Sequence, residues 1–284
     1  STLFPYTTLF RSPYRRATPS DQFELILSLD VNRIDSEPYR GEVTQGTFGN
    51  EPGAYTFNEA YKGWETIDYS GAALTANYSL ASGNSLTSIT ALRKSEWQTH
   101  YDETNNGFDH AYAEYEQSSD YASQELRLSS ASGETLEYVV GIYYSYQKSD
   151  THTPVFVGDG LADIFGIPYG WQSFDQRADV TTDGYAAFAN ATWHFAERWA
   201  ATLGGRYTYE EKDLNFQQFD PNGLGFVPEI GPLTDDYSDG KFTPTASLMY
   251  SLNPSWNLYA TYSSGYKSGG FYMEIGRASC RERV

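Results

Sequence analysis

The sequence has a single cysteine, Cys280, so neither a disulfide framework nor a cysteine-based metal site can organise the fold. It has no run of the ~18 consecutive apolar residues that a membrane-spanning helix needs. Cations are scarce, since 19 Lys and Arg stand against 37 Asp and Glu, for a net charge of −18. Such an acidic chain is not expected to bind nucleic acid, because that binding relies on cations that neutralise phosphates.

Motifs that carry catalysis are also missing. The chain has no Gly-x-Ser-x-Gly, no phosphate-binding glycine loop and no His-Glu-x-x-His, and its four histidines are scattered. We therefore expect no enzyme activity, no metal site and no cofactor.

Aromatic residues are abundant at 17% of the chain, with 25 Tyr, 16 Phe and 6 Trp. Disordered chains are poor in aromatics, so disorder is not expected. Tyr and Trp combine an apolar body with a polar tip and suit membrane interfaces. The mean hydropathy of −0.56 does not argue against a membrane, because a barrel alternates lipid-facing and lumen-facing residues.

Alternation of apolar and polar residues is the main structural signal. In residues 199–212, for example, Leu203 and Tyr207 fall on one face and Arg206 on the other. Most such segments reach the ~9–11 residues that cross a bilayer as a tilted strand. The pattern predicts nine strands: 23–31, 69–80, 85–99, 118–129, 135–147, 183–195, 199–212, 242–252 and 256–268.

Short and long connections alternate between these strands. The short ones lie at 81–84, 130–134, 196–198 and 253–255, and the long ones at 32–68, 100–117, 148–182 and 213–241. An up-and-down barrel with short periplasmic turns and long extracellular loops has this arrangement. Trp193, Phe195, Trp199 and Trp256 lie beside short turns, where an aromatic girdle is expected.

The alternation also assigns faces. We expect an outward, lipid-facing set and an inward set of Arg206, Thr245 and Thr261; the outward set is Leu203, Tyr207, Leu248, Tyr250, Leu258 and Tyr262. In a soluble fold, the apolar set would instead be buried in a core.

Four stretches resemble the barrel strands of TonB-dependent outer-membrane receptors. They are residues 86–93 (LTSITALR), 123–130 (SQELRLSS), 204–212 (GGRYTYEEK) and 256–272 (WNLYATYSSGYKSGGFY). The resemblance implies an all-β chain that forms part of an antiparallel up-and-down transmembrane barrel. It implies about nine strands of a barrel of about 22, left as an open curved sheet whose first and last strands do not pair.

The resemblance also implies a function. Such a receptor sits in the outer membrane among lipid and lipopolysaccharide and takes up a large nutrient: an iron-siderophore, a cobalamin-like compound or a glycan. It couples to the TonB complex through a plug region that this sequence does not contain. The extracellular ligand stays unknown. The alternatives are a passive porin-like channel and a soluble β-rich binding module.

One aromatic group is the candidate ligand-binding site. In the receptor family, aromatic loop residues often contact the ligand, and the predicted loop 148–182 holds five: Phe156, Phe165, Tyr169, Trp171 and Phe174. The alternative is that these side chains pack on one another as the core of the loop.

Residues 1–12 and 275–284 resemble translated sequencing adapter. The last ten residues contain Cys280 and three arginines in an otherwise acidic chain. We expect the barrel segment to occupy residues 13–274 and both end segments to pack poorly against it.

Overall fold

The computed structural model describes residues 7–38, 59–103 and 107–271. The described residues form one antiparallel sheet and a short helix, α1 (Asp159–Phe165). The strands are β1 (Thr7–Arg11), β2 (Tyr14–Ser20), β3 (Phe23–Ser36), β4 (Trp64–Ser79), β5 (Ser85–Asp102), β6 (Ala111–Ser129), β7 (Leu136–Val157), β8 (Gln172–Ala196), β9 (Trp199–Phe219), β10 (Ile230–Asn253) and β11 (Trp256–Ser263).

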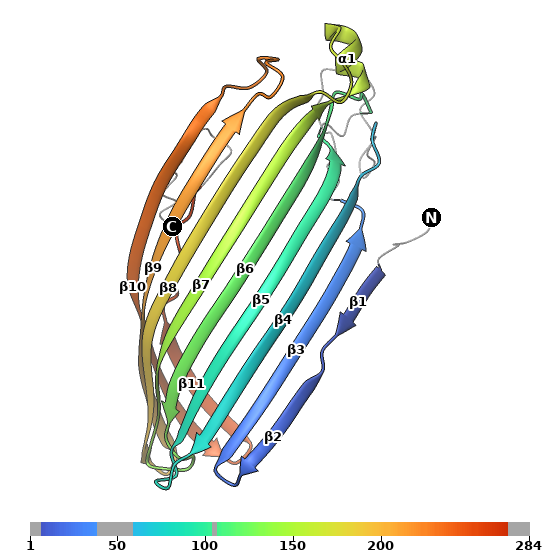
Figure 1. The fold of residues 1–284 in the computed structure, drawn as a ribbon. Helices are drawn as coiled ribbons and strands as arrows, with labels where there is room; N and C mark the ends of the chain where they lie inside the picture. Colours follow the sequence, from blue (N-terminus) through green and yellow to red (C-terminus); the bar gives the residue numbers. More distant parts are fainter. Residues whose placement is uncertain (1–6, 39–58, 104–106, 272–284) are drawn as a thin grey trace.

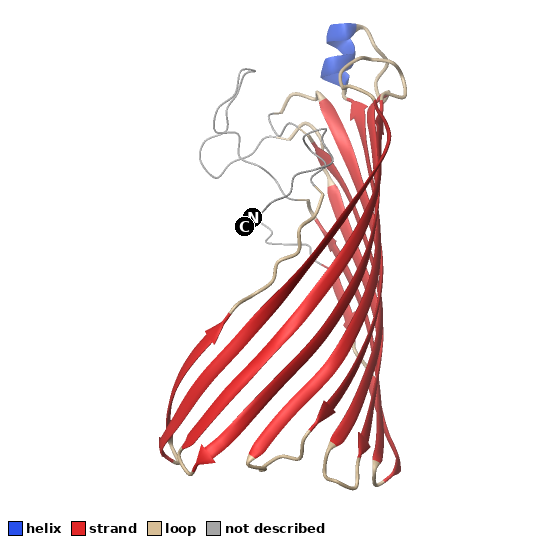
Figure 2. Cartoon of the chain, turned by 90° about the vertical axis from the view of Figure 1, so that its left-hand side faces the viewer, coloured by secondary structure: helices blue, strands red, loops and turns tan. Residues whose placement is uncertain are grey.

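Each strand from β3 to β10 pairs with the next one along the chain (Figure 1). The sheet curves into a wall, and the path of paired strands starts at β1 and ends at β11, so the sheet is not closed (Figure 2). All nine predicted strands are present as β3 to β11. The predicted next-neighbour order and the open sheet are therefore confirmed.

Beyond β3, the edge of the sheet is a strand broken in two. β1 pairs with Val31–Asp35 of β3, and β2 pairs with Phe23–Ser28. The expectation that residues 1–12 pack poorly is therefore wrong for residues 7–11. The backbone N–H and C=O groups on the edge of β3 accept almost any extended partner, because ladder hydrogen bonds do not depend on side-chain identity. Residues 1–6 and 275–284, with Cys280, lie outside the described residues.

The strands β3 to β10 are longer than predicted, whereas β11 ends at Ser263, before the predicted residue 268. β7, β8 and β10 have 22, 25 and 24 residues, which exceeds the length that crosses a bilayer. The long connections shrink accordingly to residues 37–63, 103–110, 158–171 and 220–229, all at one end of the sheet. The hydrophobic pattern did not predict these extra residues. Beyond the bilayer, both faces of a strand contact water, so apolar and polar residues no longer need to alternate.

The apolar face of the wall is exposed, as a lipid-facing surface requires. Leu203, Leu258 and Tyr262 are 68%, 57% and 65% exposed, and Tyr207 and Leu248 are exposed as well. Arg206 lies on the other face, with its guanidinium 5.3 Å from the ring centroid of Tyr143. This distribution confirms the face assignment and contradicts a soluble β-rich module, in which the apolar set would be buried.

Two aromatic belts border the lipid-facing surface. The predicted belt at the short turns is present, with Trp193 5.3 Å from Phe195 and Trp199 4.6 Å from Tyr250 between ring centroids. A second belt of tyrosines lies further up the same face, comprising Tyr144, Tyr185, Tyr207 and Tyr209. Trp199 and Tyr209 are ten positions apart on β9 (209 − 199), which matches the ~9–11 residues of a membrane-spanning strand.

None of the helices in the described part of the chain is long and apolar enough to span a membrane.

Candidate ligand-binding wall at the loop end

The strands continue beyond the tyrosine belt to the end that carries α1 and the long connections, and there the two faces of the wall can be told apart. After β11 the chain rises along the inner, concave side of the curve (Figure 2). Phe271 of that segment packs on Ala178, Leu214 and Phe216. The face that carries these three side chains is therefore the inner face, and the opposite face carries the apolar band and the tyrosine belt.

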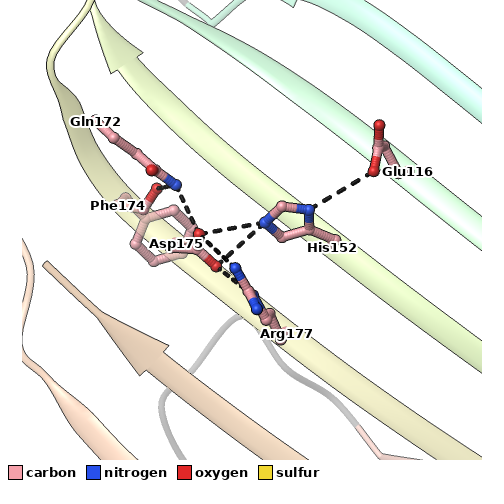
Figure 3. Close-up of polar contacts among 6 residues, drawn as sticks. All are labelled: Glu116, His152, Gln172, Phe174, Asp175 and Arg177. Carbon is pink, nitrogen blue, oxygen red and sulfur yellow. Dashed lines mark hydrogen bonds and ion pairs between the residues drawn. The ribbon is translucent and has the colours of Figure 1, made fainter. Parts of the chain in front are cut away.

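On the outer face, a polar network centred on the buried carboxylate of Asp175 ties β6, β7 and β8 together (Figure 3). Gln172 Nε2 donates to this carboxylate at 2.7 Å and Arg177 Nε at 3.0 Å, and His152 Nε2 lies 3.2 Å away. His152 Nδ1 is 3.6 Å from Glu116 on β6. Burial alone would raise the pKa of Asp175, but hydrogen bonds from Arg177, His152 and Gln172 outweigh it and hold the pKa below its usual range.

Also on the outer face, an aromatic stack crosses the ends of β5, β6 and β7. The His100 ring lies 4.4 Å from Tyr61 and 5.2 Å from Tyr112, and Tyr112 lies 5.1 Å from Phe156. Burial lowers the pKa of His100, although the Glu114 carboxylate, 3.3 Å from Nδ1, acts in the opposite direction. The stack fixes the end of the β3–β4 connection onto the rim of the wall.

The five predicted ligand-binding aromatics do not form one cluster. Phe156 stacks on Tyr112, whose ring centroid is also 6.1 Å from that of Tyr169. Phe165 instead meets Phe226 of the β9–β10 connection edge-on at 5.8 Å. Trp171 is 41% exposed just before β8, and Phe174 is half-buried on β8. Among the described residues no ring pair joins two of the five, and a role for them in binding stays a prediction.

The inner face between the tyrosine belt and the loops carries hydrogen-bonded amides and hydroxyls. Gln117 Nε2 donates to Ser149 Oγ at 3.1 Å, and Gln147 Nε2 donates to Ser119 Oγ at 3.0 Å. Trp97 adds an aromatic surface, with its ring 4.7 Å from that of Tyr115. This inner wall can offer a passing ligand both hydrogen bonds and ring faces.

Sequence reasoning missed the inner wall, although a signal for it exists. Residues 94–101 alternate charged or ionisable residues (Lys94, Glu96, His100) with neutral ones such as Trp97. This alternation has the two-residue period of a strand but no apolar face, so a search for hydrophobic periodicity passes over it. Across the part of the chain that the structure describes, no group of three or more His, Cys, Asp or Glu could hold a metal ion.

Comparisons with known proteins identify the family. The family model "TonB dependent receptor-like, beta-barrel" matches residues 10–276. The ferric yersiniabactin uptake receptor FyuA from Yersinia pestis superimposes with a TM-score of 0.72 at 16% identity, over 96% of this chain and 39% of FyuA. The siderophore receptor PiuA from Acinetobacter baumannii gives 0.69 at 15% identity, over 91% and 42% of the two chains.

The alcaligin receptor FauA from Bordetella pertussis gives a TM-score of 0.54 at 15% identity, over 90% of this chain and 35% of FauA. No curated protein sequence matches the chain significantly. The chain thus spans about two fifths of the length of FyuA and PiuA. The family match over nearly the whole chain, the open wall of up-and-down strands and the lipid-facing band agree. The chain belongs to the TonB-dependent receptor β-barrel family of the outer membrane.

Proposed function

We propose that this chain is part of the barrel of an outer-membrane receptor that actively takes up a nutrient too large for passive diffusion. The observation that carries the proposal is a membrane-spanning wall of the TonB-dependent receptor family. The solved relatives FyuA and PiuA are named as uptake or siderophore receptors, and this naming supports a role in nutrient uptake.

The energy source separates this proposal from a passive porin-like channel. The TonB complex would act through a plug domain, which the described residues do not include. In the source bacterium, deletion of the gene and deletion of tonB should abolish uptake of the same nutrient. Uptake that needs the gene but survives tonB deletion would establish a passive channel instead.

The loop aromatics are the proposed contacts for incoming ligand. Phe165, Tyr169 and Trp171 are 58%, 52% and 41% exposed at the loop end, so a ligand can reach them. Phe156 and Phe174 are half-buried and would support the rim. Replacing Phe165 or Trp171 with Ala should weaken capture more than replacing Phe156, as measured by binding of the transported nutrient to whole cells.

We also propose contacts with membrane lipid and lipopolysaccharide. Lys94 and Lys148 lie on the outer face near the tyrosine belt, at the level of lipid headgroups. Each forms an ion pair with a carboxylate two residues along its strand, Lys94 with Glu96 at 2.7 Å and Lys148 with Asp150 at 3.0 Å. Such mixed charge suits a surface in contact with zwitterionic or cation-bridged headgroups.

A further inference from the structure

Above the tyrosine belt, the two faces of β5 to β8 carry different kinds of side chain. The strand register assigns each residue to a face, since directly paired residues point to the same side of the sheet. Most charged side chains of these strand segments fall on the outer face, whereas Arg93 is on the inner face. The outer set, with the ionisable histidines, is Lys94, Glu96, His100, Asp102, Glu114, Glu116, Asp120, Lys148, Asp150, His152, Asp175, Arg177, Asp179 and Asp183.

Above the row that contains Arg93, the inner face of these strand segments is uncharged within the described residues. One transverse row runs Trp97, Gln117, Thr151 and Ala178, and the next runs Ser95, Ser119, Ser149 and Val180. Arg93 lies in the next row toward the short turns, which it shares with Gln147 and, on β9, Lys212; it pairs with Asp30 at 3.1 Å. Arg127, which pairs with Glu125 at 3.4 Å, lies nearer the short turns.

The uncharged wall keeps free hydrogen-bonding capacity. Gln117 and Gln147 each donate one N–H to a neighbouring serine. A glutamine side chain has two N–H donors and a carbonyl with two lone pairs, so most of its capacity remains for a ligand. The faces of Trp97 and Tyr115 provide apolar stacking surface beside these amides.

We propose that this inner wall binds an uncharged, hydroxyl-rich ligand of the oligosaccharide class. Sugar hydroxyls match the alternating amides and hydroxyls, and sugar C–H faces match aromatic rings. An anionic iron chelate would need Arg or Lys to replace its lost hydration. The two uncharged rows contain neither residue, and the cations in the row below, Arg93 and Lys212, already pair with Asp30 and Glu210. The net charge of −18 would also repel an anion.

On β9, Lys212 and Glu210 border this surface and form an ion pair at 3.8 Å. On β4, Glu65 borders it and is also engaged. Its carboxylate accepts hydrogen bonds from Ser36 Oγ at 2.7 Å and from Trp97 Nε1 at 3.1 Å. It therefore holds the Trp97 ring in place at the edge of the wall.

Fluorescence titration of the full chain in detergent micelles tests the inference, after circular dichroism has shown that each variant is folded. The neutral probes are maltohexaose and cellohexaose, the charged probes are ferric citrate and hexagalacturonate, and ferrichrome represents an uncharged chelate. We expect a neutral oligosaccharide to change the tryptophan emission. Trp97→Phe should remove most of that change, whereas Trp193→Phe on the lipid-facing side should retain it.

Two substitutions that change charge on opposite faces of the same strand make the test more specific. Gln117→Glu puts a carboxylate on the inner wall and should weaken oligosaccharide binding about tenfold, because it removes both amide donors and introduces a charge that must be desolvated. Glu116→Gln, one residue away on the outer face, should leave binding unchanged.

The inference rests on the proposed uptake function, but the two can fail separately. Binding of ferric citrate or ferrichrome without any neutral oligosaccharide would overturn the ligand class and leave the uptake receptor intact. If no probe of any class binds the folded chain, the ligand assignment is overturned, and uptake that is unaffected by gene deletion would overturn the receptor function as well.

Discussion

Leu248 and Thr245 lie three residues apart on β10 and face different surroundings. Leu248 is 45% exposed in the apolar band, whereas Thr245 is on the inner face. Leu248→Arg would place a cation in hydrocarbon and should cost about 2–4 kcal/mol of stability. Thr245→Arg should cost far less, because its guanidinium reaches water. Urea unfolding in lipid vesicles measures the stability of both variants. Equal losses of stability would contradict the face assignment.

Asp175 should make stability depend on pH. Its folded pKa is depressed, so its contribution is fully present above the ordinary carboxyl pKa of about 3.9 and is lost as the pH falls through the folded value. At pH 7, Asp175→Asn should destabilise the β7–β8 end by about 1–3 kcal/mol, because Arg177 and His152 lose their acceptor.

Urea midpoints at pH 7 and at pH 3 compare this variant with the unsubstituted protein, and the difference should shrink at pH 3. Asp163→Asn, on an exposed position of α1, is the control and should have little effect at either pH. If Asp175→Asn lowers the urea midpoint by the same amount at both pH values, the proposed contribution of Asp175 to the pH dependence of stability is contradicted.

At the scale of single residues, the sequence predicts which face of a strand a side chain occupies but not its contacts across strands. The faces of Leu203, Tyr207 and Arg206 could be predicted, because the bilayer imposes strict alternation on a spanning strand. The stack of Tyr61, His100 and Tyr112 could not, because it joins the β3–β4 connection, β5 and β6. Such contacts depend on the register between strands, which the hydrophobic pattern specifies only where one face is buried.

Among the elements, the hairpin turns at the short-turn end depend on glycine. Gly83 and Gly133 both have φ near +83°, a left-handed conformation that costs other residues about 1–2 kcal/mol. Gly133→Ala should therefore cost about 1 kcal/mol, although a Cβ there would meet no atom within 4 Å. Gly231→Ala has equal space without a positive φ and should change stability by less than about 0.5 kcal/mol. If thermal unfolding shows equal losses of stability for Gly133→Ala and Gly231→Ala, the left-handed turn conformation is not the cause of the loss.

At the scale of elements, the sequence predicts the existence and order of the strands but not their full length. The nine segments and their order follow from turn residues and alternation. The upper ends of β7 and β8 do not, since residues such as Lys148, Asp150 and His152 look like a loop when both faces are polar. The strand pair persists there because backbone ladder bonds run on from His152↔Arg177 to Val155↔Phe174.

At the scale of the whole molecule, the open sheet leaves two edges, β1–β2 and β11, and a wide exposed apolar face. In water such a surface should associate with other copies. We predict that the chain stays dispersed in detergent and aggregates when detergent is removed. Analytical ultracentrifugation before and after detergent removal measures this. A monodisperse, folded species without detergent would contradict the membrane-exposed assignment of the apolar face.

Strands that extend beyond the bilayer also divide each ladder into two environments. β8 has 25 residues, so at ~3.4 Å per residue it is about 85 Å long, far more than a tilted crossing needs. The lower hydrogen bonds are shielded by hydrocarbon, while the upper ones compete with water. Amide exchange should therefore be graded along a single continuous strand, slow beside Trp193 and fast beside Arg177. The rim can open and close locally while the membrane-embedded half keeps its shape.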